Sequence, residues 1–136
     1  LKATPKANAL LMAAAVADYR PATPSESKLK KGATPRLTLK LVRNPDILSE
    51  VKGDLIKVGF AAESEDLVKN ATAKLKEKRL HLIVANDITA TDSGFGADTN
   101  KVVLIDRRGK KEELPLLPKS EVAHKILDKV VELLAK

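Results

Sequence analysis

Four short stretches of this sequence run from apolar residues directly into a polar or acidic cluster, and they cover residues 10–18, 37–46, 55–63 and 82–87. Inner strands of an open parallel sheet are buried on both faces, so they consist mostly of apolar residues, and ligands bind beyond their carboxyl ends. The pattern predicts one crevice lined by the side chains that follow these strands: Asp18, Asn44, Asp46, Glu63, Asn86 and Asp87. Alternatively, Asn and Asp end each strand by making a turn. The recurrence, with a lysine cluster between the first two stretches, favours a site for an anionic ligand.

The composition limits what kind of protein this chain can be. Its 136 residues, 43% apolar and 32% charged, suit one folded domain over residues 1–136 and neither a disordered nor a fibrous chain. The absence of cysteine excludes disulfides, thiolate zinc sites and a cysteine nucleophile, and leaves only His81 and His124 for histidine chemistry. No apolar run approaches the roughly 18 residues of a membrane span, and the start lacks a signal-peptide pattern. We therefore expect a cytoplasmic protein with no membrane partner.

The charge indicates a polyanionic partner. The net charge is +7 and the isoelectric point is near 9.6, which suits either a nucleic acid or a phosphorylated small molecule. Single-stranded nucleic acids usually stack on aromatic rings, and this chain offers only Tyr19, Phe60 and Phe95. This scarcity disfavours a nucleic-acid partner without removing that interpretation.

Strand and helix patterns alternate along the chain. Residues 10–16, 56–61 and 82–84 are predicted as buried strands, residues 36–42 as a half-exposed strand and residues 19–35 as a long loop. Asn44 is predicted to cap a helix to about residue 51, and Ser64 a helix to about residue 79. A terminal helix is predicted to open at Ser120. Residues 102–105 and 113–116 flank Arg108-Gly109 as a hairpin. The order predicts an α/β fold: a three-layer, mostly parallel sheet with a β-hairpin near the C-terminus.

The helix predicted after Ser64 carries lysines at unexpected positions. Lys74 and Lys78 fall on or beside the stripe that Leu67, Ala71 and Leu75 turn towards the core. One interpretation is snorkelling, in which apolar stems pack and the ammonium groups reach water. The other is that the stripe ends at the crevice, where two ammonium groups meet a nucleotide or phosphate.

The long loop poses a similar choice. Lys28, Lys30 and Lys31 precede Gly32, and such a run is usually a solvated face. A mobile lysine loop beside Asp18 would also suit clamping a triphosphate with its magnesium ion. Asp18 is accordingly the one candidate magnesium ligand that we single out among the side chains.

Five segments together resemble the bacterial phosphopantothenate–cysteine ligases, the synthetase part of a bifunctional coenzyme A biosynthesis protein. They are residues 13–21 (AAAVADYRP), 28–31 (KLKK), 44–47 (NPDI), 59–63 (GFAAE) and 84–87 (VAND). Their order and spacing agree with the family from about Ala7 to the C-terminal helix. The family begins its domain with a strand, a glycine-rich loop and a helix start, which this chain lacks. The chain therefore looks like the later part of a synthetase (CTP-binding) domain.

The resemblance implies a Rossmann-like fold and a two-step reaction. The carboxylate of 4′-phosphopantothenate would attack the α-phosphate of CTP to give an acyl cytidylate, and the amine of L-cysteine would then displace CMP. Mg²⁺ would accompany CTP, whereas FMN belongs only to the decarboxylase part, which is absent from this chain. The strand at 36–42 resembles the arm through which two subunits pair, so a homodimer is expected.

The resemblance also assigns residues by matching position. Lys28 would be catalytic and would act on phosphates or the acyl cytidylate. The CTP site would comprise Met12, Ala13, Ala14, Asp18, Lys28, Asn44, Pro45, Asp46, Ile47, Phe60, Lys74 and Lys78. Asn86 and Asp87 are further site candidates. The alternative function is a non-enzymatic basic α/β module that binds nucleotide or RNA, and preference for CTP with magnesium over RNA would separate the two.

Overall fold

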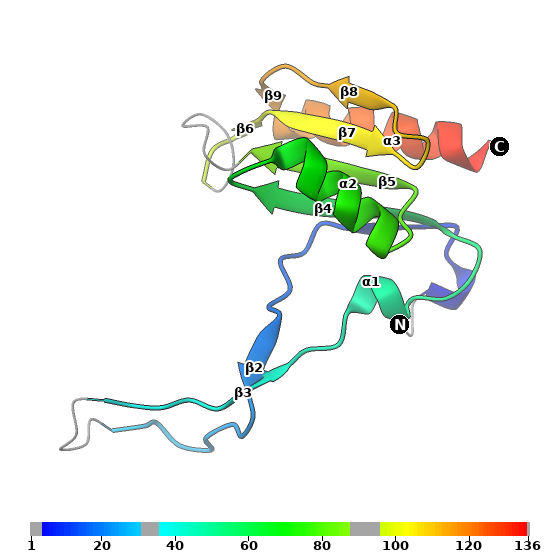
Figure 1. Cartoon of the computed structure of the whole chain (residues 1–136). Helices are drawn as coiled ribbons and strands as arrows, with labels where there is room; N and C mark the ends of the chain where they lie inside the picture. Colours follow the sequence, from blue (N-terminus) through cyan, green and yellow to red (C-terminus); the bar gives the residue numbers. More distant parts are fainter. Residues whose placement is uncertain (1–3, 31–35, 88–95, 136) are drawn as a thin grey trace.

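A computed structural model of the chain describes residues 4–30, 36–87 and 96–135. A five-stranded sheet with the order β1-β4-β5-β7-β8 lies at its centre (Figure 1). The strands are β1 (Ala9–Met12), β4 (Ile56–Glu63), β5 (Leu82–Asp87), β7 (Val102–Asp106) and β8 (Lys111–Glu113). β1, β4 and β5 are parallel neighbours, and β7 and β8 extend the sheet as an antiparallel hairpin. The predicted mostly parallel sheet with a hairpin near the C-terminus is confirmed, although the second hairpin strand is Lys111–Glu113 rather than residues 113–116.

Two helices cover opposite faces of this sheet (Figure 1). α2 (Leu67–Glu77) buries Ala71 and Leu75 against one face, and α3 (Lys119–Leu134) buries Val122 and Ile126 against the other. The inner strands are buried on both sides, as their apolar sequence predicts, with Val84 1% exposed. The three-layer prediction is confirmed.

Smaller elements complete the fold. They are η1 (Thr4–Lys6), α1 (Ile47–Glu50), and a two-stranded pair of β6 (Thr99–Asn100) with β9 (Leu117–Pro118). A second pair, β2 (Tyr19–Pro21) with β3 (Leu41–Arg43), forms a ribbon that stands apart from the central sheet (Figure 1). No helix within the described part of the chain is long and apolar enough to cross a membrane.

The first and second predicted strands differ from the observed ones. Residues 10–16 were expected to form one buried strand, but β1 ends at Met12 and residues 13–18 are exposed outside the sheet. Small alanine side chains offer little area to bury there, so sheet packing does not extend the strand. Residues 36–42 were expected as a strand and 19–35 as a loop, yet only Leu41–Arg43 is a strand, and its partner is Tyr19–Pro21. The prediction missed this pairing because both segments are exposed and carry no core pattern.

Two predicted helix caps are also wrong. Asp46 rather than Asn44 caps α1, and its Oδ1 accepts from the Ser49 N–H at 3.3 Å. Asp66 rather than Ser64 precedes α2, with a left-handed φ of 47° and no side-chain cap bond. The terminal helix begins at Lys119, one residue before the predicted Ser120. In both cases the loop continues past the first polar residue, so the helix begins later than predicted.

Candidate functional site

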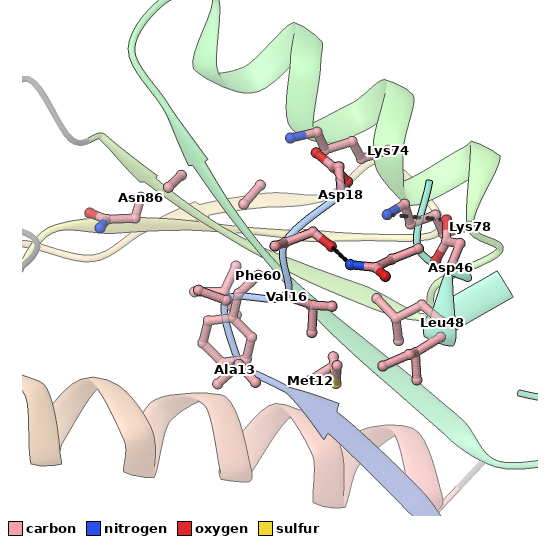
Figure 2. Close-up of a pocket in the computed structure, with 18 of the residues that line it drawn as sticks. Met12, Ala13, Val16, Asp18, Asp46, Leu48, Phe60, Lys74, Lys78 and Asn86 are labelled. Carbon is pink, nitrogen blue, oxygen red and sulfur yellow. Dashed lines mark hydrogen bonds and ion pairs between the residues drawn. The ribbon is translucent and has the colours of Figure 1, made fainter. Parts of the chain in front are cut away.

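A cavity of about 580 Å³ opens at the carboxyl ends of β1, β4 and β5 (Figure 2). Its walls are Met12 at the end of β1, residues 13–18, residues 43–48 at the start of α1, Phe60 in β4, and the C-terminal part of α2. Such volumes are typical of small-ligand sites, and the position is where open parallel sheets bind ligands. We call this cavity the crevice.

The structure brings most of the predicted site residues into the crevice. Those that line it are Met12, Ala13, Ala14, Asp18, Asn44, Pro45, Asp46, Ile47, Phe60, Lys74, Lys78 and Asn86. Lys28 is exposed in the segment beyond β2 and does not line the crevice, and neither does Asp87. Glu63, which was expected to converge with them, lies just outside the lining. Lys31 falls outside the described residues.

Hydrogen bonds from Asn44 hold the wall formed by residues 13–18. Its Nδ2 donates to the Ala17 main-chain oxygen at 2.7 Å, and its own N–H donates to the Asp18 main-chain oxygen at 2.8 Å. Its Oδ1 accepts from Arg20 Nη1 at 2.8 Å. Asn44 therefore ties the crevice wall to the base of the β2–β3 ribbon.

Both predicted lysines carry an acidic partner. Lys74 Nζ donates to Glu63 Oε1 at 2.7 Å, and Lys78 Nζ lies 3.4 Å from Asp46 Oδ2. Their side chains remain 45% and 30% exposed, so the ammonium groups are available to a ligand from the crevice side. Burial acts to raise the pKa of Asp46, but hydrogen bonds from Ser49 together with the charge and hydrogen bond of Lys78 outweigh it, so the pKa is lowered.

Several further lining residues were not predicted from the sequence: Arg43, Glu77, Asn100 and Lys119. Glu77 lies three residues after Lys74 on the same helix and could have been found by that spacing. Arg43 could have been found because it directly precedes the Asn-Pro-Asp sequence at residues 44–46, which was predicted to line the site. Asn100 and Lys119 come from the distant β6 and the start of α3, so only the fold brings them in.

Charges in the crevice nearly balance. Among the residues that the structure describes, four cationic side chains line it, from Arg43, Lys74, Lys78 and Lys119, against three anionic ones from Asp18, Asp46 and Glu77. Within the described residues no group of three or more carboxylates or histidines is placed to hold a metal ion. The arrangement suits a polyanion that arrives with its own divalent cation, because Mg²⁺ is often held by one or two carboxylates together with substrate phosphates.

Uncharged groups occupy a different part of the crevice. Figure 2 shows Asn86 apart from Lys74 and Lys78, and the Phe60 ring nearer to Ala13 than to either lysine. The Phe60 side chain is 40% exposed, which is unusual for a phenylalanine in a buried sheet and leaves its ring available to a ligand. One region of the crevice thus holds charges of both signs, at Lys74, Lys78 and their acidic neighbours, and Phe60 offers an apolar surface away from it.

The three-layer sheet and this crevice define an α/β domain with a small-ligand site at the carboxyl edge of its parallel strands. Comparison with known sequences gives the family. The chain belongs to the family described as the DNA/pantothenate metabolism flavoprotein C-terminal domain, whose model matches residues 1–134.

Individual relatives agree with this family. The coenzyme A biosynthesis bifunctional protein CoaBC of Bacillus subtilis is 45% identical over 127 residues, covering 91% of this chain and 31% of the relative. A cysteine/cysteine sulfinic acid decarboxylase from an unknown prokaryotic organism is 38% identical, covering 90% of this chain and 35% of that protein. The chain thus spans about a third of the length of these curated relatives.

A solved structure shares the fold. The crystal structure of the C-terminal domain of a coenzyme A biosynthesis bifunctional protein CoaBC superposes with a TM-score of 0.67 and 37% identity. The match covers 90% of this chain and 52% of that chain. The predicted family resemblance is confirmed.

Proposed function

We propose that this chain forms the CTP-binding part of a phosphopantothenate–cysteine ligase, which joins 4′-phosphopantothenate to L-cysteine in coenzyme A biosynthesis. The observation that carries the proposal is the pair Lys74 and Lys78, about one helical turn apart and both lining the crevice. Ammonium groups at that spacing can contact neighbouring phosphates of one triphosphate chain. The CoaBC relatives support the choice of pathway.

Each part of a nucleoside triphosphate finds suitable chemistry in the crevice. The Phe60 ring offers an apolar face for the base, and the main chain of residues 13–17 offers peptide donors and acceptors. Lys74 and Lys78 face the phosphates. Asp18, together with phosphate oxygens, would hold magnesium, which supplies charge neutralisation when bound.

The reaction explains why so many charged groups are needed. In the first step a carboxylate oxygen of 4′-phosphopantothenate bonds to the α-phosphorus of CTP, and the bond to pyrophosphate breaks. In the second step the cysteine nitrogen bonds to the acyl carbon and loses a proton, and CMP leaves with the former carboxylate oxygen. Both steps gather anions in one place, so fixed cations offset their repulsion and hold the reacting atoms in line.

The β2–β3 ribbon supports a homodimer. Leu37, Leu39 and Leu41 are 72%, 59% and 55% exposed along one segment, which is a costly arrangement for a monomer. A second copy that pairs through this ribbon and through residues 37–40, which lead into β3, would cover these leucines. Because Lys28 lies outside the crevice of its own chain, we propose that it serves the crevice of the second copy as the catalytic lysine.

Nucleotide turnover in the longest natural form of the protein tests this function. We expect sustained release of CMP and pyrophosphate from CTP only when 4′-phosphopantothenate, L-cysteine and magnesium are all present. With 4′-phosphopantothenate but no cysteine, the first step alone should give a single round of pyrophosphate release and no CMP. Release of ADP and phosphate from ATP would contradict the ligase proposal. Tight binding of CTP or RNA without any turnover would favour the alternative, a non-enzymatic binding module.

A further inference from the structure

We infer that Glu63 is a positioning residue that holds the Lys74 ammonium group at the wall of the crevice. Glu63 Oε1 accepts from Lys74 Nζ at 2.7 Å, and the Glu63 side chain is only 12% exposed. Lys74 lines the crevice, whereas Glu63 does not. The carboxylate therefore lies behind the ammonium group, away from the space that a ligand would fill. The inference rests on the proposed function, because it assigns Lys74 a phosphate partner.

Glu63 is itself fixed by a second contact. Its Oε2 accepts from Asn70 Nδ2 at 3.3 Å, and the same Asn70 nitrogen donates to the Glu65 main-chain oxygen at 2.9 Å. Asn70 and Lys74 are four residues apart, so they lie on one side of α2 in successive turns. One carboxylate at the end of β4 thus contacts two turns of the helix and has little freedom to follow a moving lysine.

This geometry preorganises the Lys74 ammonium group to bind an anion. An ammonium group has three donors, and within the described part of the chain Lys74 donates to Glu63 alone. A lysine side chain loses considerable rotamer freedom when it is fixed, and here that loss occurs on folding rather than on ligand binding. The second lysine differs, because its partner Asp46 lines the crevice and stands in the ligand space itself.

The negative charge of Glu63 works against an incoming phosphate, so the charge and the anchoring effect must be separated. Glu63→Gln and Glu63→Ala do this, since both remove the charge but only Gln keeps an oxygen that can accept from Lys74. We expect Glu63→Ala to bind CTP with magnesium about fivefold more weakly than Glu63→Gln in the longest natural form of the protein. In a Lys74→Met background the two variants should bind within twofold of each other, because the residue on which Glu63 acts is gone.

A matched control exists on the far side of the sheet. Glu112 in β8 pairs with Lys129 in α3 at 3.0 Å, and neither lines the crevice. Glu112→Gln and Glu112→Ala should bind CTP equally well. This comparison shows how much CTP affinity changes when an ion pair outside the crevice is lost. Melting temperatures of all variants separate weakened binding from weakened folding.

The ammonium resonance of Lys74 gives a readout that needs no ligand. Its ¹⁵N–¹H signal, assigned by its absence in Lys74→Met, should persist in Glu63→Gln and broaden beyond detection in Glu63→Ala. If the wild-type protein fails to bind CTP, the proposed function falls, while this resonance still tests whether Glu63 holds Lys74. Equal CTP affinities of the Gln and Ala variants in an otherwise wild-type protein, or an unchanged resonance in Glu63→Ala, would overturn the inference.

Discussion

Asn44 Nδ2 donates to the main-chain oxygen of Ala17 at 2.7 Å, and this bond joins two segments 27 residues apart in the sequence. Residues 13–18 belong to no strand, so the sheet does not fix their conformation. The two bonds from Asn44, to Ala17 and to Asp18, hold the wall of the crevice instead. The side-chain amide of Asn44 is thus occupied within the protein, and a nucleotide would meet the main chain that it orients.

Asn44→Asp tests this relationship. The change keeps an acceptor for Arg20 but places a second carboxylate oxygen against the Ala17 oxygen, so one hydrogen bond is lost and two acceptors face each other. We expect the free energy of unfolding to fall by about 1 kcal/mol and CTP to bind about tenfold more weakly. Chemical denaturation and calorimetric titration measure the two effects. Arg20→Met, which leaves the Ala17 bond intact, should weaken CTP binding less, and the reverse order would contradict the assigned role of Asn44.

Lys74→Met and Lys78→Met should both weaken CTP binding, by about 1.5 to 3 kcal/mol each, which is typical of a hydrogen bond to a charged group. Their effects on stability should differ. Lys74→Met leaves the Glu63 carboxylate, 12% exposed, without its cation, and should lower the free energy of unfolding by about 1 to 3 kcal/mol. The partner of Lys78, Asp46, is 36% exposed and also accepts from the Ser49 N–H, so Lys78→Met should lower the free energy of unfolding much less.

Calorimetric titration beside thermal unfolding decides between ligand contact and snorkelling for these lysines. Snorkelling predicts unaltered CTP affinity in both variants, and that result would withdraw Lys74 and Lys78 from the site. Lys129→Met provides a control, because Lys129 pairs with Glu112 away from the crevice. It should leave CTP affinity unchanged.

The fold could be predicted from the sequence where side chains are buried, because burial requires an apolar pattern. Buried elements have recognisable apolar patterns, and these patterns predicted the strands, helices and layers. Examples are the apolar runs of β4 and β5 and the helical spacing of Val122, Ile126 and Val130. The β2–β3 pair left no such signal, since all of its residues are exposed. Its pairing rests on main-chain hydrogen bonds, which every residue type but proline can both donate and accept.

The site was predictable where polar residues follow buried strands and where helical spacing is periodic. Lys74 and Lys78 were identified in this way, and both line the crevice. Lys119 was not, because it reaches the crevice from α3, more than 100 residues from Asp18 in the sequence. The acidic partners of the lysines were also missed, since Glu63 was expected to face the ligand with the other polar residues rather than to stand behind Lys74.

His81 should make stability depend on pH. Its Nδ1 accepts from the Lys57 N–H at 3.0 Å, and the pKa of the ring is lowered by burial first, then by the nearby charges of Arg107 and Lys57, against an opposing effect of Asp54. The folded protein therefore binds this proton less readily than the unfolded chain, whose histidine has a pKa near 6.5. The free energy of unfolding should fall as pH drops from about 6.5 towards the lower folded pKa, and then level off.

Denaturation at several pH values, with matched variants, measures this effect. His81→Asn keeps an acceptor near the Lys57 N–H without a titrating ring, so its stability should lose the decrease below pH 6.5. Arg107→Gln removes one cause of the shift and should move the pKa of His81 upward in a histidine NMR titration. A decrease of the same size in wild type and His81→Asn would assign the pH dependence to other groups.

The position of Lys28 leads to a test of subunit cooperation. Lys28 lies in an exposed segment beyond β2 and outside the crevice of its own chain, whereas Lys74 lines that crevice. Lys28→Gln should reduce the ligase rate by roughly a hundredfold to a thousandfold through lost charge stabilisation, with the melting temperature unchanged. Lys30→Gln, at an exposed neighbouring position, should reduce the rate less than tenfold. Similar losses at both positions would mean that the lysines act only through their combined charge.

If Lys28 serves the crevice of the second copy, unfolding and refolding a mixture of Lys28→Gln and Lys74→Met chains should restore activity. In each mixed dimer one crevice then has an intact Lys74 and receives an intact Lys28 from the other chain. A mixture as inactive as its two components would instead place Lys28 at the crevice of its own chain.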